Sequence, residues 1–292
     1  IVEGSGTNVF DLETISTTVS AGFDTFNRAL YIDGNAINES EYLDKFRTAH
    51  NNSKFPENEP VHYAVAVKRC DLKCWPMDEY LGYNATDPDD EIELSAINVN
   101  EPFVIRDRCI VDGKTFYYGQ AKCCAGWVNA ENLAEFDSKE EWVNAWKVDV
   151  SAKDFIVVTQ DVITLEPSAT TPETSEVKLM IGTVLKLVPE SEIPRNIGER
   201  GPWNNYVVYL PTRDANGKYV RQYALISEHY TVSTGFLPMT QTNILNVTFS
   251  CLGNRYGWGG MLGAMDCSLY TRAIYLCFGL ELPRNTTWQE LT

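Results

Sequence analysis

The sequence has few basic residues, few histidines and no long apolar run. Its 292 residues include 24 Lys and Arg against 40 Asp and Glu, which gives a formal net charge of −16 at pH 7. An acidic protein repels phosphate groups, so this balance argues against nucleic acid and anionic membranes as partners. No apolar stretch reaches the length of a membrane-spanning helix, and we therefore expect no membrane insertion.

The sequence also lacks the Cys and His spacing of a metal site. It has eight cysteines but no recurring C-x-x-C pair, and the three histidines, His50, His62 and His229, sit near none of the cysteines. We therefore predict neither a metal nor another cofactor. The cysteines could form disulfides, and buried free thiols are the alternative for most of them.

The first residues, Ile1-Val2-Glu3-Gly4, show neither an initiator Met nor a signal pattern. We expect a mature or trimmed product, which is compatible with export. The chain is too long for one small core and long enough for several compact modules, so a multidomain protein is the first expectation.

The apolar periodicity changes along the chain. Residues 1–60 carry apolar residues at helical spacing, at 9–12, 23–31 and 42–46, and predict a helical N-terminal segment. From Val61 the apolar residues alternate with a period of two, which is typical of short strands.

Two β-rich regions follow, at residues 61–148 and 149–237, joined by a short predicted helix around residues 138–142. In the first region, a turn at Asp112-Gly113 and an end at Gly126-Trp127-Val128 resemble bacterial SH3-type domains. The stretch Asp71-Leu72-Lys73 with Trp75-Pro76 resembles the "LR-x-x-P" opening of SH3 domains attached to cell-wall peptidases. We interpret both regions as SH3-like small barrels.

Most of the candidate catalytic and binding residues lie in residues 238–292. A predicted helix ends at Gly253, a glycine-rich loop follows at residues 256–260, and Cys267 precedes the apolar run 269–278. A cysteine at the start of a helix lies at the positive end of the helix dipole, which favours the nucleophilic thiolate.

These residues resemble the NlpC/P60 family of cysteine peptidases. Residues 255–260 (RYGWGG), then Cys267-Ser268, then residues 282–286 (LPRNT) and Gln289 follow its pattern "Y-x-W-G-G … D-C-S-G … L-P-R-x-[ST]-x-x-Q", except that Leu269 stands where the family commonly has Gly. The match covers only the first half of a papain-like α+β domain. The predicted fold is therefore multidomain α+β, with a helical N-terminal segment, two SH3-like barrels and this half-domain.

The resemblance implies that Cys267 is the nucleophile, with Tyr256 close to the thiol. It implies that Asp266 and Ser268 help to hold the free amino terminus of a peptidoglycan stem peptide, and that an acid from the first SH3 domain, for which Glu93 is our candidate, closes this end of the site. The implied reaction is hydrolysis of the bond between D-γ-glutamate and a diamino acid through a thioester. The implied location is secreted or in the cell envelope of a bacterium.

The family also needs a histidine and a third polar residue beyond the cysteine, yet the sequence ends 25 residues after Cys267 and all three histidines precede it. Either the natural chain continues, or a second polypeptide completes the domain, or the half-domain is a remnant. A half-domain would expose the apolar face of residues 269–278, which favours the first two options. The alternative function is a non-catalytic wall-binding protein, and the oligomeric state is not predicted.

Overall fold

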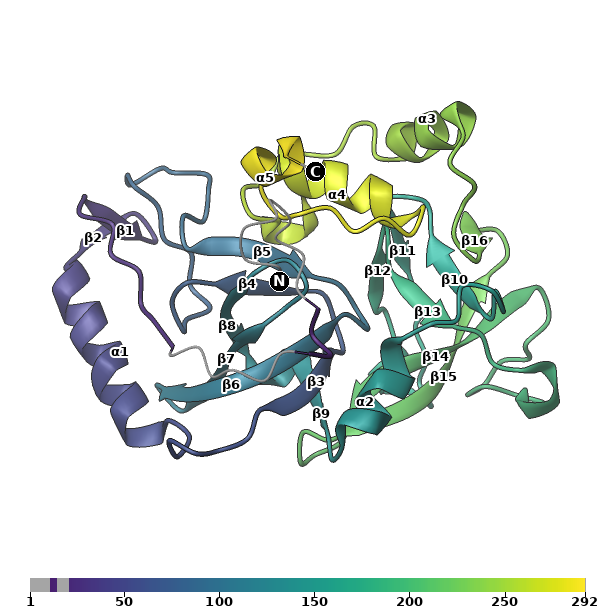
Figure 1. Cartoon of the computed structure of the whole chain (residues 1–292), viewed down its shortest axis with the longest axis horizontal. Coiled ribbons are helices and arrows are strands. Elements are labelled where there is room, and N and C mark those ends of the chain that lie inside the picture. Colours follow the sequence, from purple (N-terminus) through teal and green to yellow (C-terminus); the bar gives the residue numbers. More distant parts are fainter. Residues whose placement is uncertain (1–10, 15–20, 292) are drawn as a thin grey trace.

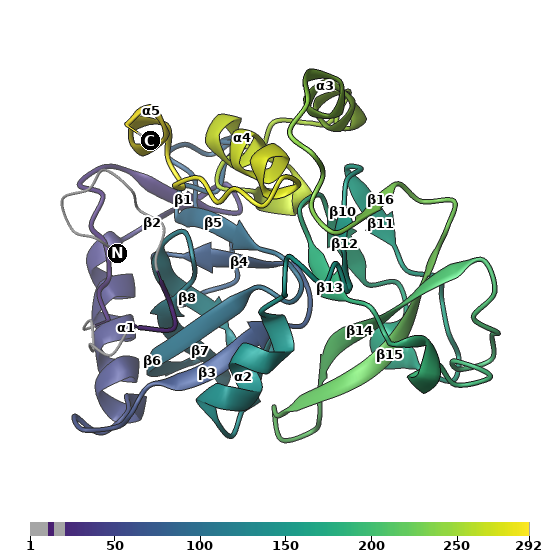
Figure 2. The same ribbon diagram turned by 45° about the vertical axis from the view of Figure 1, so that its right-hand side comes forward.

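The computed structural model describes residues 11–14 and 21–291. These residues form a mixed α+β structure with several antiparallel sheets, as predicted. Two β-rich blocks stand side by side, and the C-terminal segment lies across one end of both (Figure 1; Figure 2). The expectations for Ile1-Val2-Glu3-Gly4, Val9 and Phe10 fall outside the described residues.

The N-terminal region contains a short hairpin and one helix. Strands β1 (Leu30–Ile32) and β2 (Asn35–Ile37) pair antiparallel, and α1 (Glu39–Ser53) follows directly. The side chain of Asn38 accepts a hydrogen bond from the Ser40 amide and so caps the start of α1.

The predicted helix over residues 23–31 is wrong, because residues 23–29 form neither a helix nor a strand and β1 begins at Leu30. The ring of Phe23 stacks on Trp127 with 5.6 Å between ring centroids, and the Trp127 indole N–H donates to the Gly22 carbonyl at 3.1 Å. The Trp75 indole likewise donates to the Asp24 carbonyl at 2.8 Å. Outside a helix these carbonyls are free to accept from side chains, whereas a helix would use such carbonyls internally.

The first β-rich block is one seven-stranded antiparallel sheet in the order β5-β4-β8-β7-β6-β3-β9. Among the described residues no pairing joins β5 to β9, so closure into an SH3-like barrel stays a prediction. The strand bounds are β3 (His62–Ala66), β4 (Cys70–Lys73), β5 (Glu93–Ile97), β6 (Pro102–Val111), β7 (Lys114–Gln120), β8 (Ala125–Asn129) and β9 (Leu133–Phe136).

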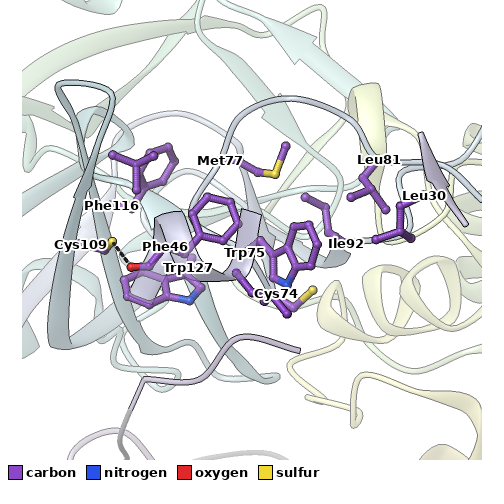
Figure 3. Close-up of a cluster of buried hydrophobic side chains, with 12 residues drawn as sticks. Leu30, Phe46, Cys74, Trp75, Met77, Leu81, Ile92, Cys109, Phe116 and Trp127 are labelled. Atoms are coloured by element: carbon purple, nitrogen blue, oxygen red, sulfur yellow. Dashed lines mark hydrogen bonds between the residues drawn. The ribbon is translucent and has the colours of Figure 1, made fainter. Parts of the chain in front are cut away.

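A cluster rich in aromatic residues joins α1 to this sheet (Figure 3). Phe46 from α1 meets Trp75 edge to face at 5.5 Å between ring centroids, and both side chains are almost completely buried. Burial of large aromatic side chains contributes most to such a core. Helix α1 therefore belongs to the first block.

The second block follows α2 (Lys139–Trp146), the short helix predicted from the sequence. It contains a three-stranded sheet in the order β13-β10-β16 and two separate hairpins, β11-β12 and β14-β15. The bounds are β10 (Phe155–Val158), β11 (Val162–Thr164), β12 (Lys178–Met180), β13 (Val184–Lys186), β14 (Asn205–Arg213), β15 (Tyr219–Ser227) and β16 (Val232–Thr234). As in the first block, a barrel is not established.

The C-terminal segment contains the helices α3 (Gln241–Ser250), α4 (Cys267–Leu276) and α5 (Thr286–Glu290). Both α3 and the start of α4 agree with the sequence prediction. Ala273, Ile274 and Cys277 pack against Phe155 and Val157 of β10. The expectation that residues 269–278 would expose their apolar face is therefore wrong, because the second block covers it.

In the part of the chain that the structure describes, no helix is long and apolar enough to span a membrane. The same residues hold no group of three or more Cys, His, Asp or Glu side chains arranged to bind a metal ion.

Candidate active site

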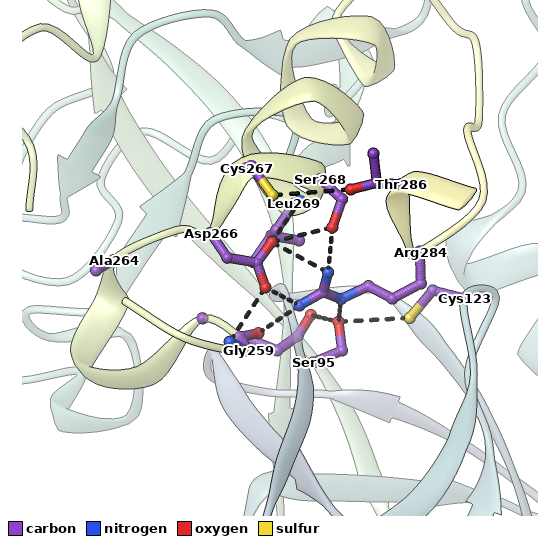
Figure 4. Close-up of polar contacts among 12 residues, drawn as sticks. Ser95, Cys123, Gly259, Ala264, Asp266, Cys267, Ser268, Leu269, Arg284 and Thr286 are labelled. Carbon is purple, nitrogen blue, oxygen red and sulfur yellow. Dashed lines mark hydrogen bonds and ion pairs between the residues drawn. The ribbon is translucent and has the colours of Figure 1, made fainter. Parts of the chain in front are cut away.

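Cys267 is the first residue of α4, and its side chain is exposed (Figure 4). All eight cysteines are free, and the other seven are buried or half-buried. The Cys267 Sγ atom lies 3.7 Å from the hydroxyl of Thr286 at the start of α5. Cys267 is thus a solvent-accessible thiol at the amino end of a helix whose inner face is packed.

Asp266 fixes the start of this helix. Its Oδ1 atom accepts a hydrogen bond from the Leu269 amide at 2.8 Å, which is the usual arrangement of an N-cap. Its Oδ2 atom accepts from the Gly259 amide at 3.1 Å and so ties the glycine-rich loop to the helix.

Arg284 organises the polar cluster behind Cys267. Its guanidinium donates to both carboxylate oxygens of Asp266, at 3.1 and 2.6 Å, and to the Ser268 hydroxyl at 2.8 Å. Its Nε atom donates to the Ser95 hydroxyl of β5 at 2.9 Å (Figure 4). The cluster therefore connects the first block to the helix that carries Cys267.

This cluster balances the charge of Asp266 internally. Burial opposes ionisation of Asp266, but the hydrogen bonds and positive charge of Arg284 outweigh it and lower the pKa of the carboxyl group. Asp266 and Ser268 are each only 6% exposed, and both already accept hydrogen bonds from Arg284. Their predicted contact with a substrate ammonium stays a prediction. Both side chains help to hold the start of α4.

The glycine-rich loop packs closely on the first block. Gly259 has a φ of +67°, and a Cβ atom there would lie 2.7 Å from the Cγ atom of Glu93. Arg69 donates to the carbonyls of Gly260 at 2.6 Å and Ala264 at 3.3 Å. Glycine is required at position 259 both by the backbone conformation and by this close approach.

Glu93, at the start of β5, is 2% exposed, and neither carboxylate oxygen has a hydrogen-bond partner. Burial, followed by the negative charge of Asp71, raises the pKa of Glu93 to about 9. Its carboxyl group is therefore protonated at neutral pH and lies against the loop that precedes Cys267.

Tyr256 is 61% exposed on the far side of the same loop, where it forms a bridge with Met265, two residues before Cys267. Partial burial, then the charges of Asp266 and Cys267, raise the pKa of the Tyr256 hydroxyl. Four of the five predicted residues lie together in the C-terminal segment: Tyr256, Asp266, Cys267 and Ser268. The fifth, Glu93, comes from β5 and lies against the glycine-rich loop of that segment.

The three histidines have their contacts elsewhere. His50 pairs with Asp107 at 2.8 Å, and His62 lies between Glu59 at 3.2 Å and Glu135 at 3.4 Å. His229 is exposed in a turn next to Tyr230. In residues 21–291 no hydrogen bond or ion pair joins a histidine to Cys267, so this part of the chain supplies the thiol without an adjacent imidazole.

Sequence reasoning missed two residues. Arg284 was recognised only as a letter of the motif, although its pairing with Asp266 could have been expected of a buried carboxylate. Ser95 gave no signal, because only the tertiary fold brings β5 to the C-terminal segment.

Comparison with known proteins agrees with this site. The model of the NlpC/P60 family matches residues 253–292, the segment from the end of α3 through Cys267 and Arg284. The predicted resemblance to that family is thereby confirmed for the C-terminal segment, whereas the SH3-type domains stay a prediction.

The structure is similar to that of a novel NlpC/P60 endopeptidase from Photobacterium damselae subsp. piscicida. The TM-score is 0.69 at 19% sequence identity, and the match covers 90% of this chain and 53% of that one. The chain therefore spans about half the length of the solved endopeptidase. No curated protein sequence matches it.

Proposed function

We propose that this chain provides the nucleophile and part of the substrate site of a cysteine endopeptidase that cuts peptidoglycan stem peptides. The observation that supports this most strongly is the exposed thiol of Cys267 at the amino end of α4, held by the Asp266–Arg284 pair. A buried, charge-compensated cap fixes the thiol in position while leaving it open to a peptide carbonyl.

In the proposed reaction the Cys267 thiolate attacks the carbonyl carbon of the D-γ-glutamyl residue. The bond to the diamino acid breaks, its nitrogen leaves as an amine after taking up a proton, and a thioester remains on Cys267. Water then hydrolyses the thioester. The imidazole that exchanges these protons is proposed to come from residues beyond Thr292 or from a second polypeptide.

Exposed apolar side chains offer a surface for that completing segment. Most of the large exposed apolar residues of the described chain lie in its last part, among them Phe249, Leu252 and Leu262, at 62%, 80% and 79% exposure. Exposed apolar side chains that form a contiguous patch are typical of interaction surfaces, so we propose that this part of the chain contacts the completing segment.

We propose that Glu93 receives the free amino terminus of the stem peptide. Its carboxyl group is buried without a hydrogen-bond partner, and a substrate ammonium would supply the charge that favours ionisation. Tyr256, Asp266 and Ser268 would complete this end of the site.

Residues 61–148 and 149–237 are proposed as SH3-like domains that present the peptidase to the wall, which implies export to the cell envelope.

The test of the proposed activity is hydrolysis of a synthetic stem peptide with a free amino terminus by the full polypeptide, compared with its Cys267→Ala variant. Cleavage at the D-γ-glutamyl bond that the variant loses supports the proposal. Equal cleavage by both proteins would refute it.

A wall-binding protein without catalysis is the second candidate. A cavity of about 530 Å³ lies between the two blocks, lined by residues of β9, α2, β14 and β15, among them Phe136, Tyr219 and Arg221. It contains no residue of the C-terminal segment and could hold wall fragments independently of Cys267. Binding of muropeptides without cleavage by the full polypeptide would favour this function.

A further inference from the structure

Cys123 and Cys124 are adjacent in the sequence and bring their sulfur atoms within 3.6 Å of each other. They lie in the connection between β7 and β8, where the Ala121 amide donates to the Cys124 carbonyl at 3.0 Å. Cys123 is 1% exposed, whereas Cys124 is half-buried, so the pair lies nearer to solvent on the Cys124 side.

The pair touches the cluster behind Cys267. The Cys123 Sγ atom lies 3.6 Å from the Ser95 hydroxyl, which accepts the hydrogen bond from Arg284 at 2.9 Å (Figure 4). The neighbouring Lys122 forms an ion pair with Glu281 of the C-terminal segment. Only Ser95 and Arg284 separate the Cys123 sulfur from Asp266, the cap of α4.

The surroundings activate one of the two thiols. A hydrogen bond from Cys124, together with the positive charges of Arg272 and Arg284, lowers the pKa of Cys123 despite its burial. The same hydrogen bond raises the pKa of Cys124. The two thiols therefore titrate as a coupled pair, and their surroundings favour the thiolate on Cys123 over that on Cys124.

We propose that Cys123 and Cys124 are a redox modification site that a hydroperoxide oxidises to a vicinal disulfide in contact with the Ser95–Arg284–Asp266 cluster. The thiolate donates an electron pair to one peroxide oxygen, the O–O bond breaks, and a sulfenic acid forms, while hydroxide or an alkoxide leaves and takes up a proton from solvent to give water or an alcohol. The second thiol attacks that sulfur, the S–S bond forms, and the sulfenic oxygen leaves as water. Two thiols are oxidised and one peroxide is reduced.

Two geometric consequences follow. The sulfur atoms must approach from 3.6 Å to the disulfide bond length of about 2 Å, so the Cys123 sulfur or its neighbour leaves its present contact. Adjacent Cα atoms are about 3.8 Å apart, less than an ordinary disulfide prefers, so the disulfide is strained and readily reduced by thiols. The modification is therefore reversible, and it disturbs the contact to Ser95 when the Cys123 sulfur is the atom that moves.

The sequence permits a direct test. Trypsin cleavage after Lys122 and Lys139 yields the peptide 123–139, which contains both cysteines and no other. The full chain carrying Cys267→Ser, which removes the exposed thiol, is treated with hydrogen peroxide, alkylated under denaturing conditions and digested. The proposal expects peptide 123–139 to escape alkylation, to lose the mass of two hydrogen atoms, and to regain two alkylated thiols after reduction with dithiothreitol.

Cys70 and Cys74 serve as an internal control, because they are buried in different hydrophobic clusters and should remain thiols. Hydrogen exchange of residues 266–272 gives a second readout that needs no catalysis, and we expect faster exchange after oxidation. The proposal is overturned by any of three results for peptide 123–139 after peroxide treatment: two free thiols, two separate sulfinic acids, or a bridge to another cysteine. A disulfide with unchanged exchange would overturn the link to α4. Cys124→Ser should abolish the disulfide. If Cys124→Ser does not fold, the peptide masses from the Cys267→Ser protein test the proposal alone.

Discussion

The guanidinium of Arg284 donates two hydrogen bonds to the carboxylate of Asp266, at 3.1 and 2.6 Å, although the two residues lie 18 positions apart. Asp266 caps α4 and Cys267 is the first residue of that helix. The position of the thiol therefore depends on a buried ion pair, and one further contact of this pair, Ser95, belongs to the first β-rich block.

Removal of Arg284 should be strongly destabilising. Arg284→Ala leaves the buried carboxylate of Asp266 without its countercharge, and breaking a buried pair in this way costs about 3–5 kcal/mol. Urea denaturation measures the loss. Arg284→Lys keeps the charge but not the paired geometry, so its stability should lie between that of the parent and that of Arg284→Ala. The exposed Arg255→Ala is the control and should change stability little. An Arg284→Ala protein as stable as the parent would contradict this role.

A side chain at Gly259 should disrupt the loop. Gly259→Ala imposes a strained positive φ, costing about 1–2 kcal/mol, and places the Cβ atom against Glu93 at 2.7 Å. Gly263→Ala is a matched control, because its φ is +81° but no atom lies within 4 Å of the new Cβ. We expect Gly259→Ala to be the less stable variant by a further amount of about 1–3 kcal/mol in thermal or urea unfolding. Equal losses would show that the contact with Glu93 is unimportant.

Glu93 should make stability fall as pH rises. The folded protein raises the pKa of this carboxyl from 4.5 to about 9, so between these values the folded state holds a proton that the unfolded state releases. The favourable contribution is complete below pH 4.5 and is lost progressively toward pH 9. Glu93→Gln should therefore unfold at a higher temperature than the parent at pH 8, with a flatter pH dependence.

The exposed Glu79→Gln serves as the control for this series and should leave the pH dependence unchanged. A stem peptide with a free amino terminus should stabilise the parent more than it stabilises Glu93→Gln, whereas an N-acetylated peptide should not distinguish them. If both peptides shift both proteins equally, Glu93 does not receive the ammonium group.

The helix that carries Cys267 could be predicted because its signals are local. Asp266 supplies the cap, Cys267 begins the helix and the following residues carry the apolar face, all within a dozen positions. The alternation that starts at Val61 predicted β3, and two β-rich regions were predicted for the same reason, but the bounds of many of their strands were not. Closure of a sheet into a barrel depends on pairings between distant strands, and a local pattern does not determine them.

The irregular segment at residues 23–29 shows the opposite case. Phe23, Phe26 and Leu30 have spacings that a helix would satisfy, yet the rings of Phe23 and Phe26 pack on Trp127 and Trp75, more than 40 positions away. Tertiary packing outweighs local propensity there. The contact between Ser95 and Arg284 was beyond prediction for the same reason, since it joins positions 189 residues apart.

The most direct test of the account is the mass of the tryptic peptide 256–272, which contains Cys267 and no other cysteine, after the full polypeptide is mixed with stem peptide and quenched in acid. We predict a transient gain equal to the acyl part that ends in D-γ-glutamate, absent from the Cys267→Ala variant. Cleavage of the stem peptide without any such adduct, and undiminished in that variant, would contradict the assignment of Cys267 as nucleophile.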